Sequence, residues 1–303
     1  MTPPNPILPY FGKKSCFLAF PISTCQCGKV IAEPRLFVER KAGAFLTSGV
    51  KKAILLFSVL FLTWQVLYFV ALIFQTLNEY WLFAYLAVFA VAICFFVLDK
   101  QRVRDLGFTK PKAWRYIAVG FVFAVVYNVY WAVVGAPIFS TGSIQVIQHG
   151  IFSVPYNLLF ALIVGLVEET SFRGYILRNL NTAFSSTKAI VYSSILFGLY
   201  HLSLVGVFWS TTSGFETVSY WTLVVLAAVL IGFFLGYFYI GTEQTTIGTI
   251  TYHSSSIFLE SLVPFSLATS WLNGHLLSTT VYIMFIPILI LLKRKGWLSN
   301  TSR

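Results

Sequence analysis

Eight long apolar runs constrain this sequence more than any other feature. Of its 303 residues 57% are hydrophobic and 10% charged, whereas a soluble globular domain carries about 25% charged residues. A helix needs about 20 apolar residues to cross a bilayer, and most of the runs reach or approach that length. The runs cover residues 53–74, 80–98, 116–135, 151–167, 189–208, 221–241, 247–262 and 277–292. The sequence therefore predicts an all-α, polytopic membrane protein with about eight transmembrane helices.

The 21 Lys and Arg residues all fall on one side of an eight-helix topology. Eight precede residue 53, six lie in 99–115, three lie in 173–188 and four follow residue 292, while the intervening connections carry none. Positive residues favour the cytoplasmic side of a membrane, so both termini are expected in the cytoplasm. The net charge of +11 then reflects orientation in the membrane, and nucleic acid is not an expected partner.

Three regions are expected along the chain. Residues 1–50 are basic and predict a poorly structured cytoplasmic extension, for which an organellar transit peptide is an alternative interpretation. Residues 51–296 form the predicted transmembrane domain, and residues 297–303 form a short tail. Cys25 and Cys27 lie on the expected reducing side without enough neighbouring ligands for a metal site.

Two adjacent carboxylates occur where an apolar run ends, in the stretch "LVEETSFRGY". Ionisable groups at membrane depth are costly and usually functional. Glu169 and Arg173 are four residues apart in the favourable order for an ion pair on a helix. Glu168 has no such partner in sequence, so its partner must come from another helix, and an acid of this kind is suited to act as a general base. Alternatively, the pair lies at the interface, solvated by lipid headgroups.

His201 and His253 lie inside later apolar runs and are the natural partners of Glu168. Their depths match that of Glu168 if its helix extends past Glu169 and the next helix begins after residue 189. We expect these groups to line an intramembrane cavity open to the cytoplasm. Two chemistries stay open, and both end in hydrolysis of a peptide bond. In one, Glu168, His201 and His253 bind zinc, which activates water. In the other, Glu168 and His201 activate water without a metal, and His253 stabilises the oxyanion.

Several motifs together resemble a known family. "EETSFR" at 168–173 matches E-E-x-x-x-R, "FGLYH" at 197–201 matches F-x-x-x-H, and a G-x-x-x-G stretch leads to a later histidine, His253. "DLGF" at 105–108 also matches. In this order, over residues 100–292, the sequence resembles the CAAX prenyl protease and bacteriocin-processing family of intramembrane proteases, and in particular its type II CAAX endopeptidases.

The resemblance implies a function and roles for individual residues. The expected activity is cleavage near the carboxy terminus of a membrane-associated protein, with prenylated proteins as one candidate class. Glu168 would be the catalytic glutamate, His201 its water-activating partner, and His253 an oxyanion or metal group. Glu169 would also be catalytic, with Arg173 and Phe197 in support. The family is described as metalloproteases, but a metal-free glutamate mechanism is also proposed for it, so zinc is one of two options.

One position departs from the family pattern. The family usually places Asn or a similar polar residue four positions after the later histidine, and here that position is Ile257. Ser256 lies on nearly the same helical face as His253 and is the expected substitute. Loss of one oxyanion donor costs about 10²–10³ in rate. This departure favours an alternative function as a weak or inactive scaffold or immunity-type protein. A proton-coupled carrier using the same polar groups is a third hypothesis.

Overall fold

A computed structural model describes residues 33–74, 80–108, 113–135, 145–146, 153–204, 214–262, 265–266, 271–295 and 298. The chain divides into two compact units, Met1–Arg40 and Lys41–Arg303. Within the described residues the structure is helical, apart from the two-residue strands β1 (Gln145–Val146) and β2 (Phe265–Ser266), which pair antiparallel. The predicted all-α fold class is confirmed.

Each predicted apolar run overlaps one of the long helices. These are α1 (Glu33–Phe74), α2 (Tyr80–Leu98), α3 (Ala113–Tyr130), α5 (Ser153–Glu169), α7 (Ser186–Tyr200), α9 (Gly214–Gly241), α10 (Ile247–Leu262) and α11 (Trp271–Arg294). Shorter helical segments join them: η1 (Val103–Leu106), η2 (Trp131–Gly135), η3 (Thr170–Leu177), α6 (Arg178–Ala183) and η4 (His201–Leu204).

Five stretches of the described residues are long and apolar enough to cross a membrane. They are Ser48–Val70, Trp81–Leu98, Ala113–Val134, Ser153–Ala183 and Thr222–Gly241. These stretches make the chain a polytopic membrane protein, while the count of eight crossings and the cytoplasmic cavity stay predictions.

The first helix begins earlier than the apolar run predicts. α1 starts at Glu33, so residues 33–50 are helical, whereas the sequence predicted a poorly structured extension over residues 1–50. Apolarity alone missed this start because charged residues interrupt the apolar ones in the first turns of α1. Their sequence nevertheless suits a helix, with Pro34 in the first turn, where its missing N–H costs nothing.

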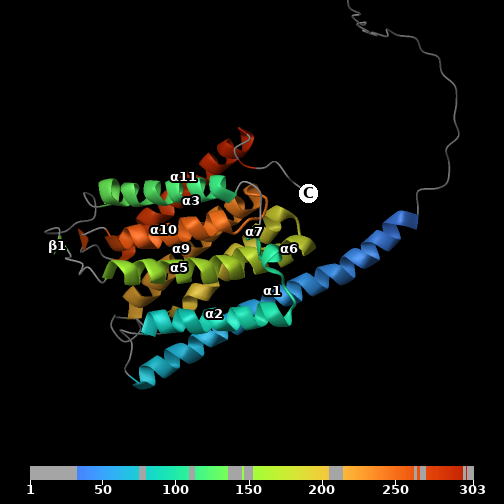
Figure 1. Ribbon diagram of the computed structural model, residues 1–303, viewed down its shortest axis with the longest axis horizontal. Helices are drawn as coiled ribbons and strands as arrows, with labels where there is room; N and C mark the ends of the chain where they lie inside the picture. Colours follow the sequence, from blue (N-terminus) through green and yellow to red (C-terminus); the bar gives the residue numbers. More distant parts are fainter. Residues whose placement is uncertain are drawn as a thin grey trace, which may run out of the picture. The chain divides into compact units, whose positions relative to one another are not determined.

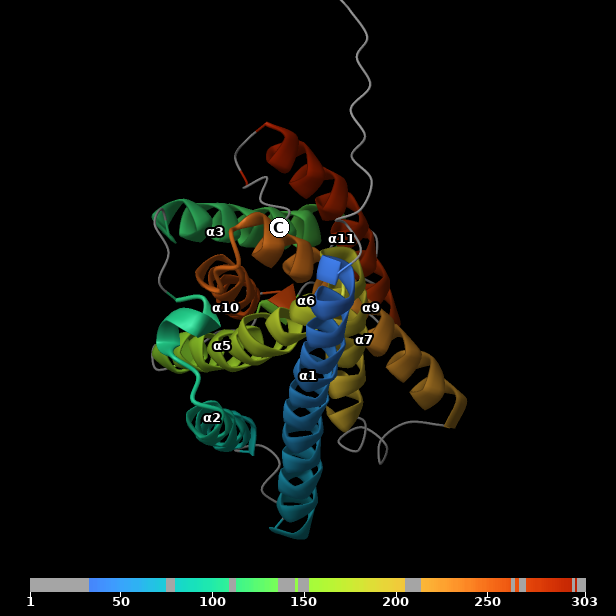
Figure 2. The ribbon, with the colours of Figure 1, turned by 90° about the vertical axis from the view of Figure 1, so that its right-hand side faces the viewer.

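The helices of residues 41–303 pack in two layers (Figures 1 and 2). In one layer α5 lies between α2 and α10, and α10 lies between α5 and α3. In the other layer α9 lies between α7 and α11. As a result α5, which carries both glutamates, has a helix on either side that can supply partners to them.

A glycine sets the spacing between α5 and α10. A Cβ atom at Gly165 would lie 2.2 Å from the Oγ of Ser254 and 3.0 Å from its backbone nitrogen. Small residues let helices approach closely where no hydrophobic force drives them together. The close approach occurs one turn before Glu169 and beside His253. It therefore brings the acidic end of α5 next to the histidine of α10.

The two glycines of the G-x-x-x-G stretch pack against α7. A Cβ at Gly232 would lie 3.0 Å from the Cα of Ser194, and one at Gly236 would lie 2.9 Å from Cγ2 of Ile190. The two glycines therefore allow α9 and α7 to pack closely.

The "DLGF" segment ties the start of α10 to the segment that follows α5. Gly107 has a φ of +89°, and its carbonyl accepts hydrogen bonds from the Thr245 hydroxyl at 2.7 Å and the Thr246 amide at 3.2 Å. Asp105 pairs with Arg178 of α6, 3.5 Å between Oδ1 and Nη2. The motif that resembled the family thus has a structural role at this end of the bundle.

A second junction joins α1, α2 and η3. Asp99, which follows α2, lies 2.7 Å from the Nζ of Lys52 and accepts a 2.7 Å hydrogen bond from the Tyr175 hydroxyl. Burial raises the pKa of Asp99, but the hydrogen bonds from Lys52, Tyr175 and Gln101 outweigh it and hold that pKa below its usual value. The junction therefore fixes η3, the helical segment that follows the two glutamates.

Candidate active site

The two glutamates at the end of α5 are buried inside the protein. The exposed fractions of Glu168, Glu169 and Arg173 are 2%, 0% and 1%. Headgroup solvation of an interfacial pair requires exposure, so that alternative interpretation is excluded. Buried charges persist only when they are paired and hydrogen-bonded, and the partners of these two acids therefore define the site.

Glu169 is held by two donors. Nη1 of Arg173 donates to its Oε1 at 2.9 Å, and Nδ1 of His253 donates to the same oxygen at 2.9 Å. The ion pair predicted from the four-residue spacing is present. The guanidinium also lies over the ring of Phe197, 4.3 Å from its centroid, which is a favourable cation–π distance. Glu169 and Arg173 thus form a fixed support for the His253 imidazole.

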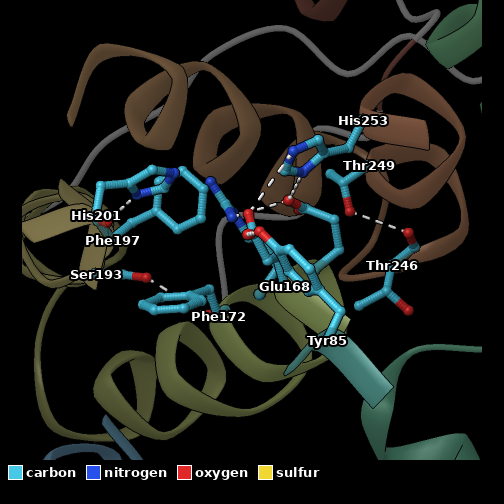
Figure 3. Close-up of polar contacts among 11 residues, drawn as sticks. Tyr85, Glu168, Phe172, Ser193, Phe197, His201, Thr246, Thr249 and His253 are labelled. Carbon is cyan, nitrogen blue, oxygen red and sulfur yellow. Dashed lines mark hydrogen bonds and ion pairs between the residues drawn. The ribbon is translucent and has the colours of Figure 1, made fainter. Parts of the chain in front are cut away.

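Glu168 finds its partners on the two helices that flank α5 (Figure 3). The hydroxyl of Tyr85, from α2, donates to Oε1 at 2.9 Å. On the other side, Nε2 of His253 lies 3.7 Å from Oε2. Because His253 uses the proton on Nδ1 to bond Glu169, its Nε2 is the nitrogen left to face Glu168. A distance of 3.7 Å exceeds that of a direct hydrogen bond, and a water molecule can bridge two polar groups at this separation.

The charges of the cluster leave room for one mobile proton. With both glutamates and Arg173 ionised and His253 neutral, two negative charges meet one positive charge, which leaves a net charge of one negative unit. One added proton makes the cluster neutral. The atoms of the cluster that could take it are Oε2 of Glu168, Nε2 of His253 and Oε2 of Glu169, and the first two lie 3.7 Å apart.

His201 lies at the end of α7 and is separated from the Glu168–His253 pair by a ring. Its Nδ1 donates to the carbonyl of Phe197 at 2.8 Å, so Nε2 is free to accept a proton. The ring of Phe197 lies 4.8 Å from that of His201 and 6.5 Å from that of His253, and Figure 3 places it between His201 and the glutamates. The structure thus brings Glu168 and His253 together and holds His201 on the other side of Phe197.

The helical path after Glu169 widens into a π-helix. η3 covers Thr170–Leu177, and every residue in it is buried. π-helical turns are rare and frequently occur at functional sites. Helical structure therefore continues past Glu169, which was the first condition for the histidines to lie at the same membrane depth as Glu168. The second condition was that the next helix begins after residue 189, but α7 begins at Ser186.

The two residues after His253 that bear on oxyanion binding lie in different surroundings. The backbone carbonyl of Ser256 accepts a 3.4 Å hydrogen bond from the Asn128 amide of α3, and the Ser256 side chain is buried. Ile257 packs against the apolar core formed by α1, α2, α5 and α7. The substitution of Ser256 for the missing polar residue stays a prediction.

A metal site was one of the two options from sequence. Among the residues described here, no group of three His, Cys, Asp or Glu side chains is arranged to hold a metal ion. Carboxylate and imidazole are suitable zinc donors, and a bond from Nδ1 to a carboxylate, as His253 makes to Glu169, is common for a histidine that binds metal through Nε2. Glu168, His201 and His253 are not gathered into a three-ligand group in the described structure, and zinc stays one of the two options.

Tyr85 is the contact to Glu168 that sequence reasoning missed. It lies in a run of apolar and aromatic residues, "YWLFAYLAVFA", without any charge to mark it. In a chain with 18% aromatic residues, such a tyrosine is typical of a lipid-facing or interfacial position. The only signal was indirect, namely that Glu168 needed a partner from another helix.

The chain matches one family model. Residues 150–259 match the type II CAAX prenyl endopeptidase Rce1-like family, and the match confirms the resemblance drawn from the motifs. The matched segment contains Glu168, Glu169, His201 and His253, whereas Tyr85 lies outside it. No curated protein matches the chain significantly.

Removal of Arg173 should destabilise the protein strongly, because the Glu169 carboxylate would stay buried without the positive charge of the guanidinium beside it. For Arg173→Met we expect a loss of about 3–5 kcal/mol in the free energy of unfolding. The double variant Glu169→Gln with Arg173→Met removes both charges and should regain much of it. The measurement is the melting temperature of purified protein in detergent, followed by tryptophan fluorescence.

The matched control is Arg115→Met, because Arg115 is exposed on α3 and its loss should change melting little. Melting of Arg173→Met at the wild-type temperature would contradict the pairing, as would a double variant less stable than the single one.

Proposed function

We propose that this member of the CAAX prenyl protease family is an intramembrane endopeptidase in which Glu168 is the general base. The observation that carries the proposal is the buried pair of Glu168 Oε2 and His253 Nε2, 3.7 Å apart. Tyr85 bonds Oε1 of Glu168, and Oε1 of Glu169 accepts hydrogen bonds from Arg173 and from Nδ1 of His253. Oε2 of Glu168 and Nε2 of His253 face each other without a direct hydrogen bond, and these are the two atoms that we propose to act on a water molecule.

The proposed reaction is the addition of water to a peptide carbonyl. A water molecule donates one proton to Oε2 of Glu168 while its oxygen attacks the carbonyl carbon. The carbon–nitrogen bond then breaks, and the leaving amine takes up the proton that Glu168 received. His253, adjacent to Oε2, can share that proton during the step. Glu169 and Arg173 keep the imidazole oriented, as a carboxylate does for histidine in other hydrolases.

The family motif predicts His201 as the water-activating partner of Glu168, and we retain that role as part of the proposal. Its hydrogen bond to the carbonyl of Phe197 fixes the ring and leaves Nε2 as an acceptor. The ring of Phe197 adjoins both His201 and His253, so we place the reacting carbonyl of the substrate beside that ring. No step in this proposal uses a metal ion.

The surroundings of the cluster support a membrane-associated substrate. Glu168 lies at the middle of Ser153–Ala183, one of the stretches able to cross a membrane, and the matched family is named for the cleavage of prenylated proteins. We propose a substrate that is cleaved near its carboxy terminus, with prenylated proteins as the candidate class. The basic residues of the sequence favour a site reached from the cytoplasm.

A second candidate function is that of a weak or inactive family member that binds a membrane partner. Ile257 supports it, since an apolar side chain packed in the core replaces a residue that usually donates a hydrogen bond. In this case the charged cluster would serve folding alone.

The first test is cleavage by Glu168→Gln. The amide keeps the shape of the side chain but cannot take a proton, so we expect turnover to fall about 10²–10⁴-fold. The measurement is hydrolysis of a farnesylated peptide by purified protein in liposomes. Glu260→Gln is the control, because Glu260 is exposed on α10 and should leave turnover unchanged. Wild-type turnover in Glu168→Gln would refute the base, and a wild-type protein that binds the peptide without cleaving it would favour the scaffold.

The second test separates the two chemistries. If the reaction is metal-free, dialysis against 1,10-phenanthroline or EDTA should leave turnover of the farnesylated peptide within about two-fold of that of the untreated protein. Removal of a catalytic metal would lower turnover far more, because a metal contributes several kcal/mol to stabilisation of the transition state. Elemental analysis of the same sample should detect no stoichiometric zinc. Loss of activity on chelation, restored by added zinc, would show that the metal option is correct.

A further inference from the structure

We infer that Tyr85 is a positioning residue for Glu168, and that α1 and α2 thereby complete a site whose other residues lie in the matched segment 150–259. This inference rests on the proposed role of Glu168 as the base. Tyr85 donates a 2.9 Å hydrogen bond to Oε1 of Glu168. Such a bond from a neutral hydroxyl to a carboxylate is charge-assisted and therefore stronger than one between two neutral groups.

The ring of Tyr85 is fixed by its neighbours. It is 8% exposed, and it makes edge-to-face contacts with Trp64 of α1 at 4.9 Å and Phe160 of α5 at 5.6 Å. Such contacts stabilise a defined ring orientation. The hydroxyl is consequently aimed at Glu168 by three helices, and in Figure 3 Tyr85 points to the glutamate from the side opposite His253.

Tyr85 decides which oxygen of Glu168 faces the histidine. The terminal torsion of a glutamate is broad and roughly two-fold, so an unrestrained carboxylate samples many orientations. With Oε1 bonded to Tyr85, Oε2 is held 3.7 Å from Nε2 of His253. Without the hydroxyl, the carboxylate can rotate away from the line that joins it to the imidazole. The expected consequence is a slower chemical step with little change in substrate binding.

The α1 helix also reaches the other side of the site. The indole Nε1 of Trp64 donates to the hydroxyl of Tyr200, and the ring of Tyr200 lies 5.8 Å from that of His201. Trp64 therefore contacts both Tyr85, which bonds the acid, and Tyr200, which adjoins the second histidine. This places α1 and α2 in the support of the site, beyond their role as membrane helices.

The experiment compares Tyr85→Phe with Tyr239→Phe. Both tyrosines are buried, but the hydroxyl of Tyr239 has no hydrogen-bond partner among the described residues, so its removal should leave kcat and KM unchanged. For Tyr85→Phe we expect kcat to fall about ten-fold or more, which corresponds to the loss of one hydrogen bond to a charged group. KM for the farnesylated peptide should stay within about two-fold.

A second measurement reads the contact without any activity. Tyr85→Phe should lower the melting temperature of the wild type but not that of Glu168→Ala, since the second background lacks the acceptor. If the wild type cleaves and Tyr85→Phe has the wild-type kcat, the positioning role is wrong. Equal loss of melting temperature in both backgrounds also overturns it. If the wild type does not cleave at all, the proposed function fails, and the melting cycle alone decides whether the contact exists.

Discussion

The structure of the site depends on the pairing of buried charges. Two carboxylates at the end of α5 are hidden from solvent, and such groups are stable only with partners of matching charge and geometry. Arg173 and His253 both donate to Oε1 of Glu169, while Tyr85 donates to Oε1 of Glu168 and His253 lies beside its Oε2. The proposed mechanism uses this arrangement, because a proton can move between the acid and the imidazole.

The packing of the helices follows from the same requirement. α5 has to lie between two helices that supply donors, and Gly165 allows α10 to approach closely enough for His253 to reach both acids. At the end of the bundle the "DLGF" segment ties Thr245 and Thr246 to Gly107. The start of α10 and the helical segment after α5 are thus held close together, which keeps His253 near the two glutamates.

Much of this arrangement could be predicted from the sequence. The apolar runs predicted the helices, because the thickness of the bilayer sets the length of a membrane-crossing helix. The four-residue spacing of Glu169 and Arg173 predicted their ion pair, because residues four apart are neighbours on one face of a helix. Contacts between helices were harder. Tyr85 carries no charge, and the position of Phe197 between His201 and Glu168 depends on how α7 packs. The early start of α1 was missed because charged residues interrupt the apolar ones in its first turns.

The central claim is that His253 lies between the two glutamates inside the bilayer, and distance measurement by solid-state NMR tests it most directly. Protein with ¹⁵N-labelled histidine and ¹³C-labelled glutamate carboxyls would be placed in lipid bilayers, with His253→Gln used to assign the signals. The account predicts dipolar contacts between Nδ1 of His253 and the carboxyl carbon of Glu169, whose Oε1 lies 2.9 Å from Nδ1, and between Nε2 and the carboxyl carbon of Glu168, whose Oε2 lies 3.7 Å from Nε2. A His253 imidazole without contact to either carboxyl group would contradict it.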